Sequence, residues 1–459
     1  MKKFYITTAI DYASALPHIG HAYEKIAADV LARYWRQKGA DVLFQTGVDE
    51  HGLKITKAAQ KALKKPQEYV DEISLTYQKA WDGLNISYDN FVRTTDPRHK
   101  EKVQKYLQIL YKKGFIYKGK YIGYYCVGCE AYINEKELEN EICPHHQKKC
   151  DKLEEDVYFF QLSKFQKKIY NLIKSDKLKI APEARKNEIL SFLKNEKLKD
   201  IAISRSKMSW GVELPWDKKH VVYVWVDALF NYLTGERNEK FWPADLHIIG
   251  KDIIRFHCVI WPAILLALEL ELPKEIFAHG YLTVNDQKMS KTIGNVVDPN
   301  ELTQKYPADA VRYYFLREFP FSSDGDFSEE KFEERYRADL ANNLGNLVQR
   351  VLKLAEQNKI KFQLEKPKIL DEVAKAIEKI ELKEALDKIW ENVIALNQDI
   401  DKNKPWEMAK KDPQKLENYL NKLANQILMV AKNLEPFLPE TASEIKNQLK
   451  TQKPKPIFI

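Results

Sequence analysis

The sequence lacks any apolar run long enough to cross a lipid bilayer. Its best stretch, residues 258–268, contains Pro262 and stops at Glu269, well short of the ~20 apolar residues that a spanning helix needs. A secretory signal pattern is missing too, because Asp11 interrupts the apolar stretch after the initial lysines. Internal repeats and low-complexity tracts are also absent. These absences predict a cytoplasmic protein that has no membrane partner.

A large excess of charge of one sign is missing as well. Among 459 residues, 74 Lys and Arg stand against 66 Asp and Glu, which gives a formal net charge of +8. This excess is compatible with a polyanionic partner, and equally with an ordinary lysine-rich surface. The length exceeds what one core usually supports, and at ~150 residues per domain it predicts about three domains.

Cysteine is scarce, and most of it is clustered. Four of the five cysteines lie close together in the sequence: Cys126, Cys129, Cys143 and Cys150. In a cytosolic protein such a cluster indicates a metal site rather than disulfides. Cys126-x₂-Cys129 and Cys143-x₂-His146 can each hold one edge of a tetrahedron, which predicts one structural zinc. His145 and Cys150 are rival ligands, and unrelated buried thiols or a redox pair are weaker alternatives.

The N-terminal half follows the strand, helix, strand order of a parallel α/β sheet. We expect strands over residues 3–9 and 41–46, with a helix over residues 18–39 between them. The pattern is interrupted after about residue 115 and returns with strand-like runs at 220–226 and 244–250. A Rossmann-type sheet split by an insertion is therefore the simplest fold for this part.

The C-terminal part is predicted to be an all-α bundle. From about Ser328 the apolar residues recur at helical spacing, and one stripe has intervals of four, three, four and three residues: Leu340, Leu344, Leu347, Val351 and Leu354. Similar amphipathic patterns cover residues 369–397 and 416–434, and Pro405 stands where a new helix could begin.

The motif His18-Ile19-Gly20-His21 is expected to open the first helix directly after the first strand. Histidines three residues apart at a helix N-terminus lie on one face, where their N–H groups and the backbone amides can bind phosphate. Gly20 allows a nucleotide to approach the backbone closely. A match of four residues alone leaves the functional and the chance interpretations about equal.

A second motif, Lys288-Met289-Ser290-Lys291-Thr292, lies in a polar loop after a strand-like run at residues 281–284. Two lysines that flank a small polar residue suit the charge that develops on a triphosphate during phosphoryl transfer. A solvated lysine loop is the alternative in so lysine-rich a chain. The two motifs in this order favour nucleotide chemistry.

Together the motifs resemble the HIGH and KMSKS signatures of class I aminoacyl-tRNA synthetases. The resemblance implies ATP with Mg²⁺, formation of an aminoacyl-adenylate, and transfer of the amino acid to tRNA, with catalysis by positioning and charge stabilisation. Within the class, the chain is most similar to the bacterial-type methionyl-tRNA synthetase family with one zinc knuckle. Four further blocks carry this likeness: residues 8–12, 46–52, 223–229 and 250–257.

The resemblance implies two sets of substrate-binding residues. ATP would be bound by Ile10, His18, Gly20, His21, Gly250, Asp252, Lys288, Ser290 and Lys291. Among these, the catalytic residues would be His18, His21, Lys288 and Lys291. The α-ammonium of methionine would pair with Asp49. Its side chain would be bound by Ala9, Tyr12, Trp225, Ala228, Tyr232, Ile253, Phe256 and His257. A soft, apolar thioether gains from such aromatic contacts.

The resemblance also assigns the C-terminal bundle to the anticodon. Asn346 and Arg350, four residues apart on one helix, would read bases of tRNA(Met), including the initiator, and Trp406 would stack on a base of the CAU anticodon. The chain stops at Ile459 without the dimer-forming domain of some relatives, so we expect a monomer.

The domain boundaries follow from these assignments. We expect a first catalytic half at 1–115, a zinc-binding insertion at 116–219, a second catalytic half at 220–280, a KMSKS-loop and stem-contact region at 281–332, and the anticodon domain at 333–459.

The chain departs from the family motifs at two positions, and three other functions were considered. Asp11 stands where many family members have proline, and Thr292 replaces the usual serine. The alternatives are a class I enzyme for cysteine, leucine, isoleucine or valine, an inactive tRNA-binding paralogue, and a nucleotidyltransferase of the wider superfamily. The small insertion, the intact motifs and the bundle argue against each of these in turn.

Overall fold

The computed structural model describes residues 2–128, 130–133, 138, 140–144, 148–236, 240–289 and 294–458. The chain forms two compact units, each assembled from segments far apart in sequence. The first unit comprises Met1–Pro17, Asp41–Lys79 and Tyr88–His279. The second comprises His18–Ala40, Ala80–Ser87 and Gly280–Ile459. Within the described residues, no helix is long and apolar enough to cross a membrane. The predicted five-part division of the chain stays a prediction.

A parallel sheet organises the first unit, as the Rossmann-type prediction required. Its strand order is β2-β3-β1-β13-β14-β8, and β4 pairs with β3. The bounds are β1 Lys3–Thr8, β2 Asp11–Tyr12, β3 Asp41–Asp49, β4 Asn90–Arg93, β8 Lys179–Ala181, β13 Leu246–Gly250 and β14 Glu275–His279. Every ladder in it is parallel. The central strand β1 is buried from Phe4 onward, as expected where helices cover both faces of a sheet.

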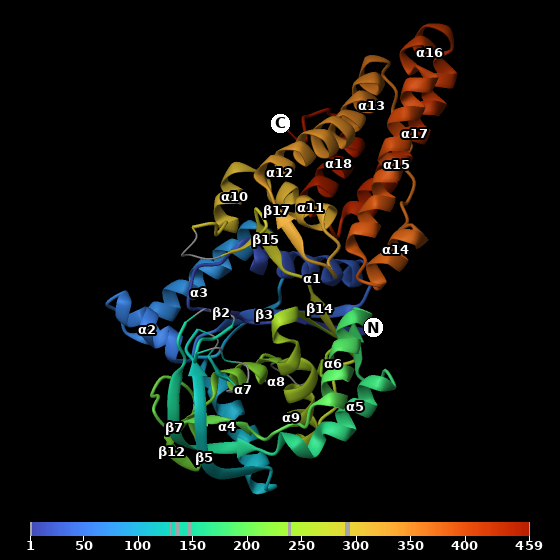
Figure 1. Ribbon diagram of the computed structural model, residues 1–459. Helices are drawn as coiled ribbons and strands as arrows, with labels where there is room; N and C mark the ends of the chain where they lie inside the picture. The colour runs from blue at the N-terminus through green and yellow to red at the C-terminus, as the bar shows by residue number, and fades with distance from the viewer. Residues whose placement is uncertain are drawn as a thin grey trace. The chain divides into compact units, whose positions relative to one another are not determined.

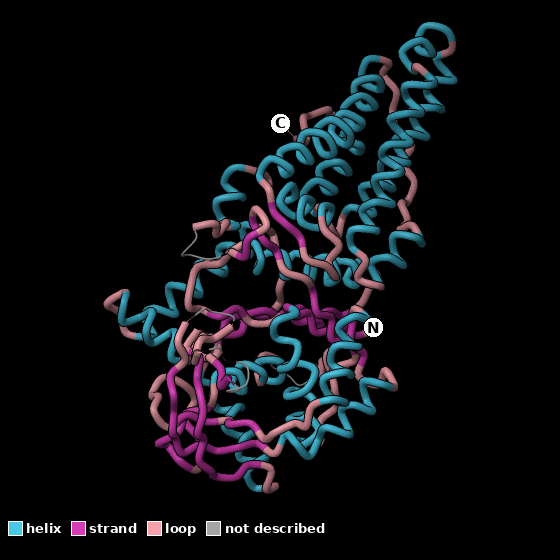
Figure 2. The backbone as a smooth tube through the Cα atoms, viewed as in Figure 1, coloured by secondary structure: helices cyan, strands magenta, loops and turns pink. Residues whose placement is uncertain are grey.

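Helices and a second, antiparallel sheet complete this unit. The helices are α2 Leu53–Lys61, α3 Pro66–Gly83, α4 Pro97–Lys112, α5 Gln166–Lys174, α6 Glu183–Asn195, α7 Val224–Leu229, α8 Asn231–Thr234 and α9 Trp261–Leu268. The antiparallel sheet contains β5 Ile116–Cys126, β6 Ala131–Ile133, β7 Asp151–Phe160 and β9 Ile201–Ala202. Figure 2 shows β5 and β7 as its long central pair.

One predicted strand is wrong in extent and in partners. Residues 220–226 were expected to return to the parallel sheet, but β12 (Asp217–Val222) ends before Tyr223. It lies in a small antiparallel sheet with β10 (Ser204–Arg205) and β11 (Glu213–Leu214). From Tyr223 the chain turns into α7, since Tyr223 is the residue before its first turn. The apolar run was ambiguous because short buried strands and helices have similar composition.

The second unit combines a helix from the N-terminal half with the C-terminal helices. Its helices are α1 Ile19–Gln37, α10 Pro299–Lys305, α11 Ala308–Glu318, α12 Glu329–Arg335, α13 Asn346–Gln357, α14 Asp371–Glu378, α15 Leu382–Asn403, α16 Pro405–Lys411, α17 Pro413–Leu434 and α18 Pro439–Thr451. A small sheet of β15 (Leu282–Val284), β16 (Gln287–Lys288) and β17 (Gly325–Phe327) precedes the bundle. The predicted all-α bundle is confirmed (Figure 1).

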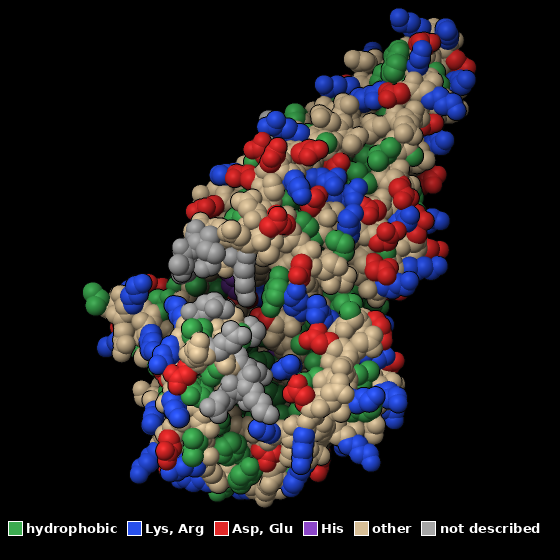
Figure 3. Space-filling view, in the orientation of Figure 1, with side chains coloured by type: hydrophobic (Ala, Val, Ile, Leu, Met, Phe, Trp, Pro, Cys, Tyr) green, Lys and Arg blue, Asp and Glu red, His purple; other side chains and the backbone are tan. Residues whose placement is uncertain are grey.

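The predicted apolar stripe packs inside the bundle. Leu340, Leu344, Leu347 and Val351 are fully buried, on a π-helical segment (Tyr336–Gly345) that continues into α13. Helix α13 contacts α15, α17 and α18. On the viewed face of the bundle, lysines and arginines are interspersed with aspartates and glutamates (Figure 3). The modest positive charge is therefore not gathered into one patch there.

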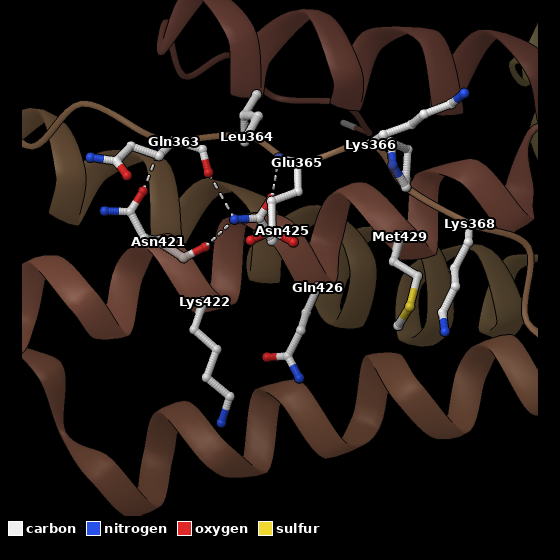
Figure 4. Close-up of a pocket in the computed structure, with 11 residues that line it drawn as sticks. Gln363, Leu364, Glu365, Lys366, Lys368, Asn421, Lys422, Asn425, Gln426 and Met429 are labelled. Carbon is white, nitrogen blue, oxygen red and sulfur yellow. Dashed lines mark hydrogen bonds between the residues drawn. The ribbon is translucent and has the colours of Figure 1, made fainter.

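Residues 363–365, which precede α14, are hydrogen-bonded to two asparagines of α17. Asn421 accepts from the backbone N–H of Gln363 (2.7 Å), and Asn425 accepts from that of Glu365 (2.8 Å) and donates to the carbonyl of Gln363 (2.9 Å). Four-residue spacing puts the two amides on one helix face, where they satisfy backbone groups that lack a strand partner. A pocket of about 740 Å³ lies between this segment and α17 (Figure 4). None of the predicted site residues lines it.

Candidate active site and family

The HIGH motif forms the first turn of α1, and His18 caps it. The His18 Nδ1 accepts from the backbone N–H of Gly20 (3.1 Å), while His21 Nδ1 accepts from the N–H of His18 (3.3 Å). The two rings stack with centroids 3.6 Å apart. This reciprocal capping box explains why the helix begins here. It also fixes both imidazoles at the positive end of the helix dipole, as a phosphate site requires.

The second signature motif reaches this helix end through Met289. A Cβ added to Gly20 would lie 3.3 Å from the Cε of Met289, so the methionine side chain packs against the glycine. The structure thereby brings part of the predicted KMSKT loop to the HIGH motif within one unit. Ser290, Lys291 and Thr292 lie outside the described residues, and so does the side chain of Lys288.

Both histidines are held neutral at pH 7. Burial lowers the pKa of His18 to about 4, and the positive charge of Lys25 adds to the effect. Burial also lowers the pKa of His21, with further contributions from His18 and Lys25. A neutral imidazole keeps one N–H donor and one acceptor. Since Nδ1 of each ring accepts a backbone hydrogen bond, Nε2 carries the hydrogen and is the donor that can bind a phosphate oxygen.

In the first unit, several predicted residues lie at the carboxyl ends of adjacent strands. Ala9 and Ile10 follow β1, Asp49 ends β3, and Gly250 ends β13. Open parallel sheets bind ligands outside this edge. Gly250 has a local reason to be glycine, because an added Cβ would lie 2.6 Å from the Oδ1 of Asp252. The side chain of Asp252 is exposed.

Several residues of the predicted side-chain pocket contact one another, and their role in binding methionine stays a prediction. Trp225 and Phe256 stack with ring centroids 4.4 Å apart, and both are half-buried. Tyr232 and His257 are buried and joined by a hydrogen bond of 2.7 Å between Oη and Nε2. Because His257 Nδ1 donates to the carbonyl of Ile253 (3.0 Å), Nε2 must accept from the tyrosine. Ala9, Tyr12, Trp225, Ile253 and Phe256 are partly buried and pack against the same hydrophobic core.

Asp49 is a buried carboxyl group whose surroundings disfavour its charged form. Burial raises its pKa well above the usual value, and the nearby carboxylates of Asp227, Glu130 and Glu50 raise it further. A backbone hydrogen bond from His51 (3.4 Å) opposes this rise in the pKa, and the hydroxyl of Thr94 also donates to Oδ1 (3.5 Å). An ammonium group beside Asp49 would stabilise its charged form. This is the environment that a receptor for an α-amino group requires.

Sequence reasoning missed the buried network behind Asp49. Asp227 accepts from His51 Nδ1 (2.7 Å) and from His99 Nε2 (3.0 Å), and His99 Nδ1 lies 2.6 Å from the hydroxyl of Thr234. Burial opposes ionisation of Asp227, but the charge interactions and hydrogen bonds with His51 and His99 outweigh it and lower the pKa. His51 and Asp227 stood in the quoted motifs, but their pairing was not visible from spacing.

The cysteine cluster is only partly described. Cys126, Cys143 and Cys150 are buried in one small cluster with Tyr124 and Ile133. Two predicted zinc ligands, Cys129 and His146, lie outside the described residues, as does His145. Within the part that is described, no three or more His, Cys, Asp or Glu side chains form a group that could hold a metal.

The predicted anticodon residues lie in the second unit. Asn346 is exposed at the start of α13, and one turn later Arg350 forms an ion pair with Asp401 on α15 (2.6 Å). Trp406 lies in the first turn of α16 and has 44% of its surface exposed, which is unusual for the largest apolar side chain. An exposed tryptophan can stack on an unpaired base.

Comparison with known proteins assigns the family. A model described as class I tRNA synthetases (M) matches residues 4–155 and 136–352, and one described as the anticodon binding domain of methionyl tRNA ligase matches residues 354–456. The chain belongs to the methionyl-tRNA synthetase family. Methionine–tRNA ligases from Clostridium tetani (43% identical) and Thermotoga maritima (42%) align with 98% and 96% of the chain and with 74% of their own length.

Solved structures agree with this assignment. The methionyl-tRNA synthetase of Mycobacterium tuberculosis in complex with methionyl-adenylate has a TM-score of 0.93 and 37% identity, and the match covers 100% of both chains. The apo form of the same enzyme has a TM-score of 0.84, with 97% of this chain and 91% of that one covered. The synthetase fold expected from the HIGH and KMSKT motifs is therefore confirmed.

Proposed function

We propose that the protein attaches L-methionine to tRNA(Met) in two steps. A carboxylate oxygen of methionine attacks the α-phosphorus of ATP, which forms methionyl-adenylate and releases pyrophosphate. The terminal ribose hydroxyl of tRNA then attacks the carbonyl carbon of the adenylate and releases AMP. The observation that carries the proposal is Asp49, a buried carboxyl group at a strand end, in a chain that matches methionine–tRNA ligases over nearly its whole length.

We assign each part of the two substrates to particular residues. Asp49 pairs with the α-ammonium, and the stacked Trp225 and Phe256 bind the thioether. The neutral Nε2–H groups of His18 and His21 donate to ATP phosphate oxygens, assisted by the N-terminus of α1. Lys288 and Lys291 neutralise charge on the departing pyrophosphate, and Mg²⁺ arrives with ATP. None of these groups forms a covalent bond to substrate.

The first step is tested by ATP–pyrophosphate exchange with each of the twenty amino acids in turn. We expect exchange that depends on methionine. Exchange that depends instead on another amino acid would contradict the pocket assignment, because Asp49 binds only the α-ammonium that all amino acids share. Exchange with none of them, with the protein folded and zinc supplied, would contradict the proposed activity.

We also propose that the chain holds one structural zinc ion. The thiols of Cys126 and Cys143 suit zinc, and the structure adds Cys150 to their cluster. With Cys129 this makes four thiols, so Cys150 competes with His146 for the fourth position. Zinc bound there ties the knuckle together and leaves no open position for a substrate.

Two matched variants identify the fourth ligand. If Cys150 binds the metal, Cys150→Ser lowers the zinc affinity at least tenfold, as loss of a ligand does, while His146→Ala leaves it unchanged. The reverse result assigns His146, as the sequence spacing predicts. Zinc affinity is measured by competition with a chromogenic chelator. A protein that is fully folded after complete zinc removal would contradict a structural role.

The remaining expectations concern partners. We propose that Asn346, Arg350 and Trp406 recognise the CAU anticodon, supported by the exposure of the tryptophan and by the match of the bundle to an anticodon-binding domain. Action on the initiator tRNA, the monomeric state and the cytoplasmic location stay predictions.

A further inference from the structure

Glu130 is a buried carboxylate that the function described so far does not use. Only 2% of its surface is exposed, and its backbone has a left-handed conformation with φ of 49°. In the sequence it directly follows Cys129 in the cysteine-rich loop. Buried carboxylates are costly unless several donors satisfy them. The donors that satisfy Glu130 identify what it does.

Three donors from three elements converge on its two oxygens. The hydroxyl of Tyr12 donates to Oε1 (2.9 Å), and the backbone N–H of Lys54 donates to the same oxygen. The hydroxyl of Tyr125 donates to Oε2. Tyr12 belongs to β2, Lys54 to the first turn of α2, and Tyr125 to β5. One side chain therefore joins the strand that carries Tyr12 to the insertion.

The contact with α2 acts as a cap. No side chain of the residue before this helix, Gly52, satisfies the first-turn amides, and Glu130 supplies the missing acceptor from a distant part of the chain. A carboxylate is also favoured by the positive end of the helix dipole. An added Cβ on Gly52 would lie 2.6 Å from the Tyr12 hydroxyl and 3.0 Å from Oε1 of Glu130. Gly52, the Tyr12 hydroxyl and the Glu130 carboxylate are therefore in close contact. Gly52 lies three residues after Asp49 in the sequence.

The backbone of Glu130 contacts a second element that carries a predicted pocket residue. Its carbonyl accepts from the hydroxyl of Tyr223 (2.7 Å), and Tyr223 is the residue before the first turn of α7. That turn carries Trp225, which stacks on Phe256. Glu130 is therefore hydrogen-bonded to the elements that carry two aromatic walls, Tyr12 and Trp225.

We propose that Glu130 is a positioning residue for methionine, because it anchors the hydroxyl of Tyr12 and so fixes that ring as a wall of the methionine pocket. This inference rests on the proposed methionine activation. The hydrogen bond orients Tyr12 before the substrate arrives, so binding does not have to order the ring. The carboxylate also adds negative potential beside Asp49, which favours the α-ammonium.

The kinetic consequence is selective for one substrate. Loss of a hydrogen bond to a buried charged group weakens an interaction by about tenfold or more. We expect Glu130→Ala to raise KM for methionine about tenfold and to leave KM for ATP within twofold in ATP–pyrophosphate exchange. Glu130→Gln keeps an amide oxygen that can accept from Tyr12 and Lys54, so it is expected to restore most of the methionine affinity.

Glu141 provides a matched control in the same insertion. It also accepts from a tyrosine hydroxyl, that of Tyr124 (3.0 Å), and pairs with Lys149 (2.9 Å), but neither group belongs to the methionine pocket. Glu141→Ala is therefore expected to leave both KM values unchanged. Zinc content is measured for each variant, so that damage to the cysteine loop is recognised.

A double-mutant cycle with Tyr12→Phe decides whether Glu130 acts through the tyrosine. If it does, Glu130→Ala raises KM for methionine much less in the Tyr12→Phe background than in the wild type. Equal effects in both backgrounds, or equal rises in KM for methionine and ATP, would overturn the inference. If Glu130→Ala does not fold, Tyr12→Phe alone still tests it, since an unchanged methionine KM would refute the anchoring. Wild-type protein without methionine-dependent exchange would instead refute the proposed function.

Discussion

Asp49→Asn is expected to lower kcat/KM for methionine at least a hundredfold in ATP–pyrophosphate exchange. Asparagine has nearly the same shape as aspartate, so the change removes the charge and keeps the volume. An α-ammonium taken into the site then loses its buried counter-charge, and unpairing such a charge typically costs 2–5 kcal/mol or more. Asp227 does not replace the lost charge, because it is already hydrogen-bonded to His51 and His99.

Asp41→Asn is the control for this experiment. Asp41 begins the same strand, and its partly exposed carboxylate pairs with Lys240 (2.7 Å). Surface ion pairs contribute little to stability, so we expect wild-type kinetics. If Asp49→Asn retained kcat/KM within threefold of wild type while Asp41→Asn did the same, the assignment of Asp49 as the ammonium receptor would be wrong.

Arg312→Met is expected to lower the free energy of unfolding of the second unit by about 3–5 kcal/mol, because it leaves a buried carboxylate without its main partner. Arg312 on α11 is fully buried and contacts Asp29 of α1 (2.7 Å), whose exposure is 0%. Its guanidinium also donates to the carbonyls of Phe437 and Pro436. One residue thus joins the helix that carries the HIGH motif to the connection between α17 and α18. Urea unfolding monitored by circular dichroism measures the loss.

Arg33→Met is the matched control for Arg312→Met. Arg33 contacts the same oxygen of Asp29 at the same distance, 2.7 Å, but 21% of its side chain is exposed. When Arg33 is removed, water can solvate the Asp29 carboxylate on this exposed side. We therefore expect a loss of unfolding free energy of about 1 kcal/mol or less. Equal losses of unfolding free energy for the two variants would show that the burial of Arg312 does not determine how much its ion pair with Asp29 stabilises the fold. A third variant, Arg312→Lys, retains the charge and should lie between wild type and Arg312→Met.

The periodic elements were predictable because their hydrophobic patterns are long. The apolar stripe from Leu340 to Val351 and the strand at residues 3–9 each repeat over several turns or positions, and both are confirmed. The run at 220–226 failed because a short apolar segment fits a strand or a buried helix turn equally well. Strand β8 inside the predicted insertion also pairs with β14 in the parallel sheet, which local sequence could not indicate.

The site was predictable where a motif carries its own geometry. His18 and His21 lie side by side at the start of α1, as their spacing predicted. Trp225 and Phe256 are 31 positions apart, and the family motifs assigned both to one pocket before the structure showed them in contact. His99 and Arg312 were missed because their partners lie more than a hundred residues away, and Glu130 because its partners are spread over three other elements. Single buried polar residues have no period, and only the folded chain shows which donors they meet.

Methionine charging of an unmodified tRNA(Met) transcript measures both steps and the bundle's role together. With ATP, Mg²⁺ and labelled methionine, we expect the CAU transcript to be charged, and the same transcript with a changed first anticodon base to be charged at least a hundredfold more slowly. Trp406→Ala should reduce charging of the CAU transcript and leave ATP–pyrophosphate exchange unchanged. Failure to charge the CAU transcript by a protein that carries out methionine-dependent exchange would contradict the account of this chain as a methionine–tRNA ligase.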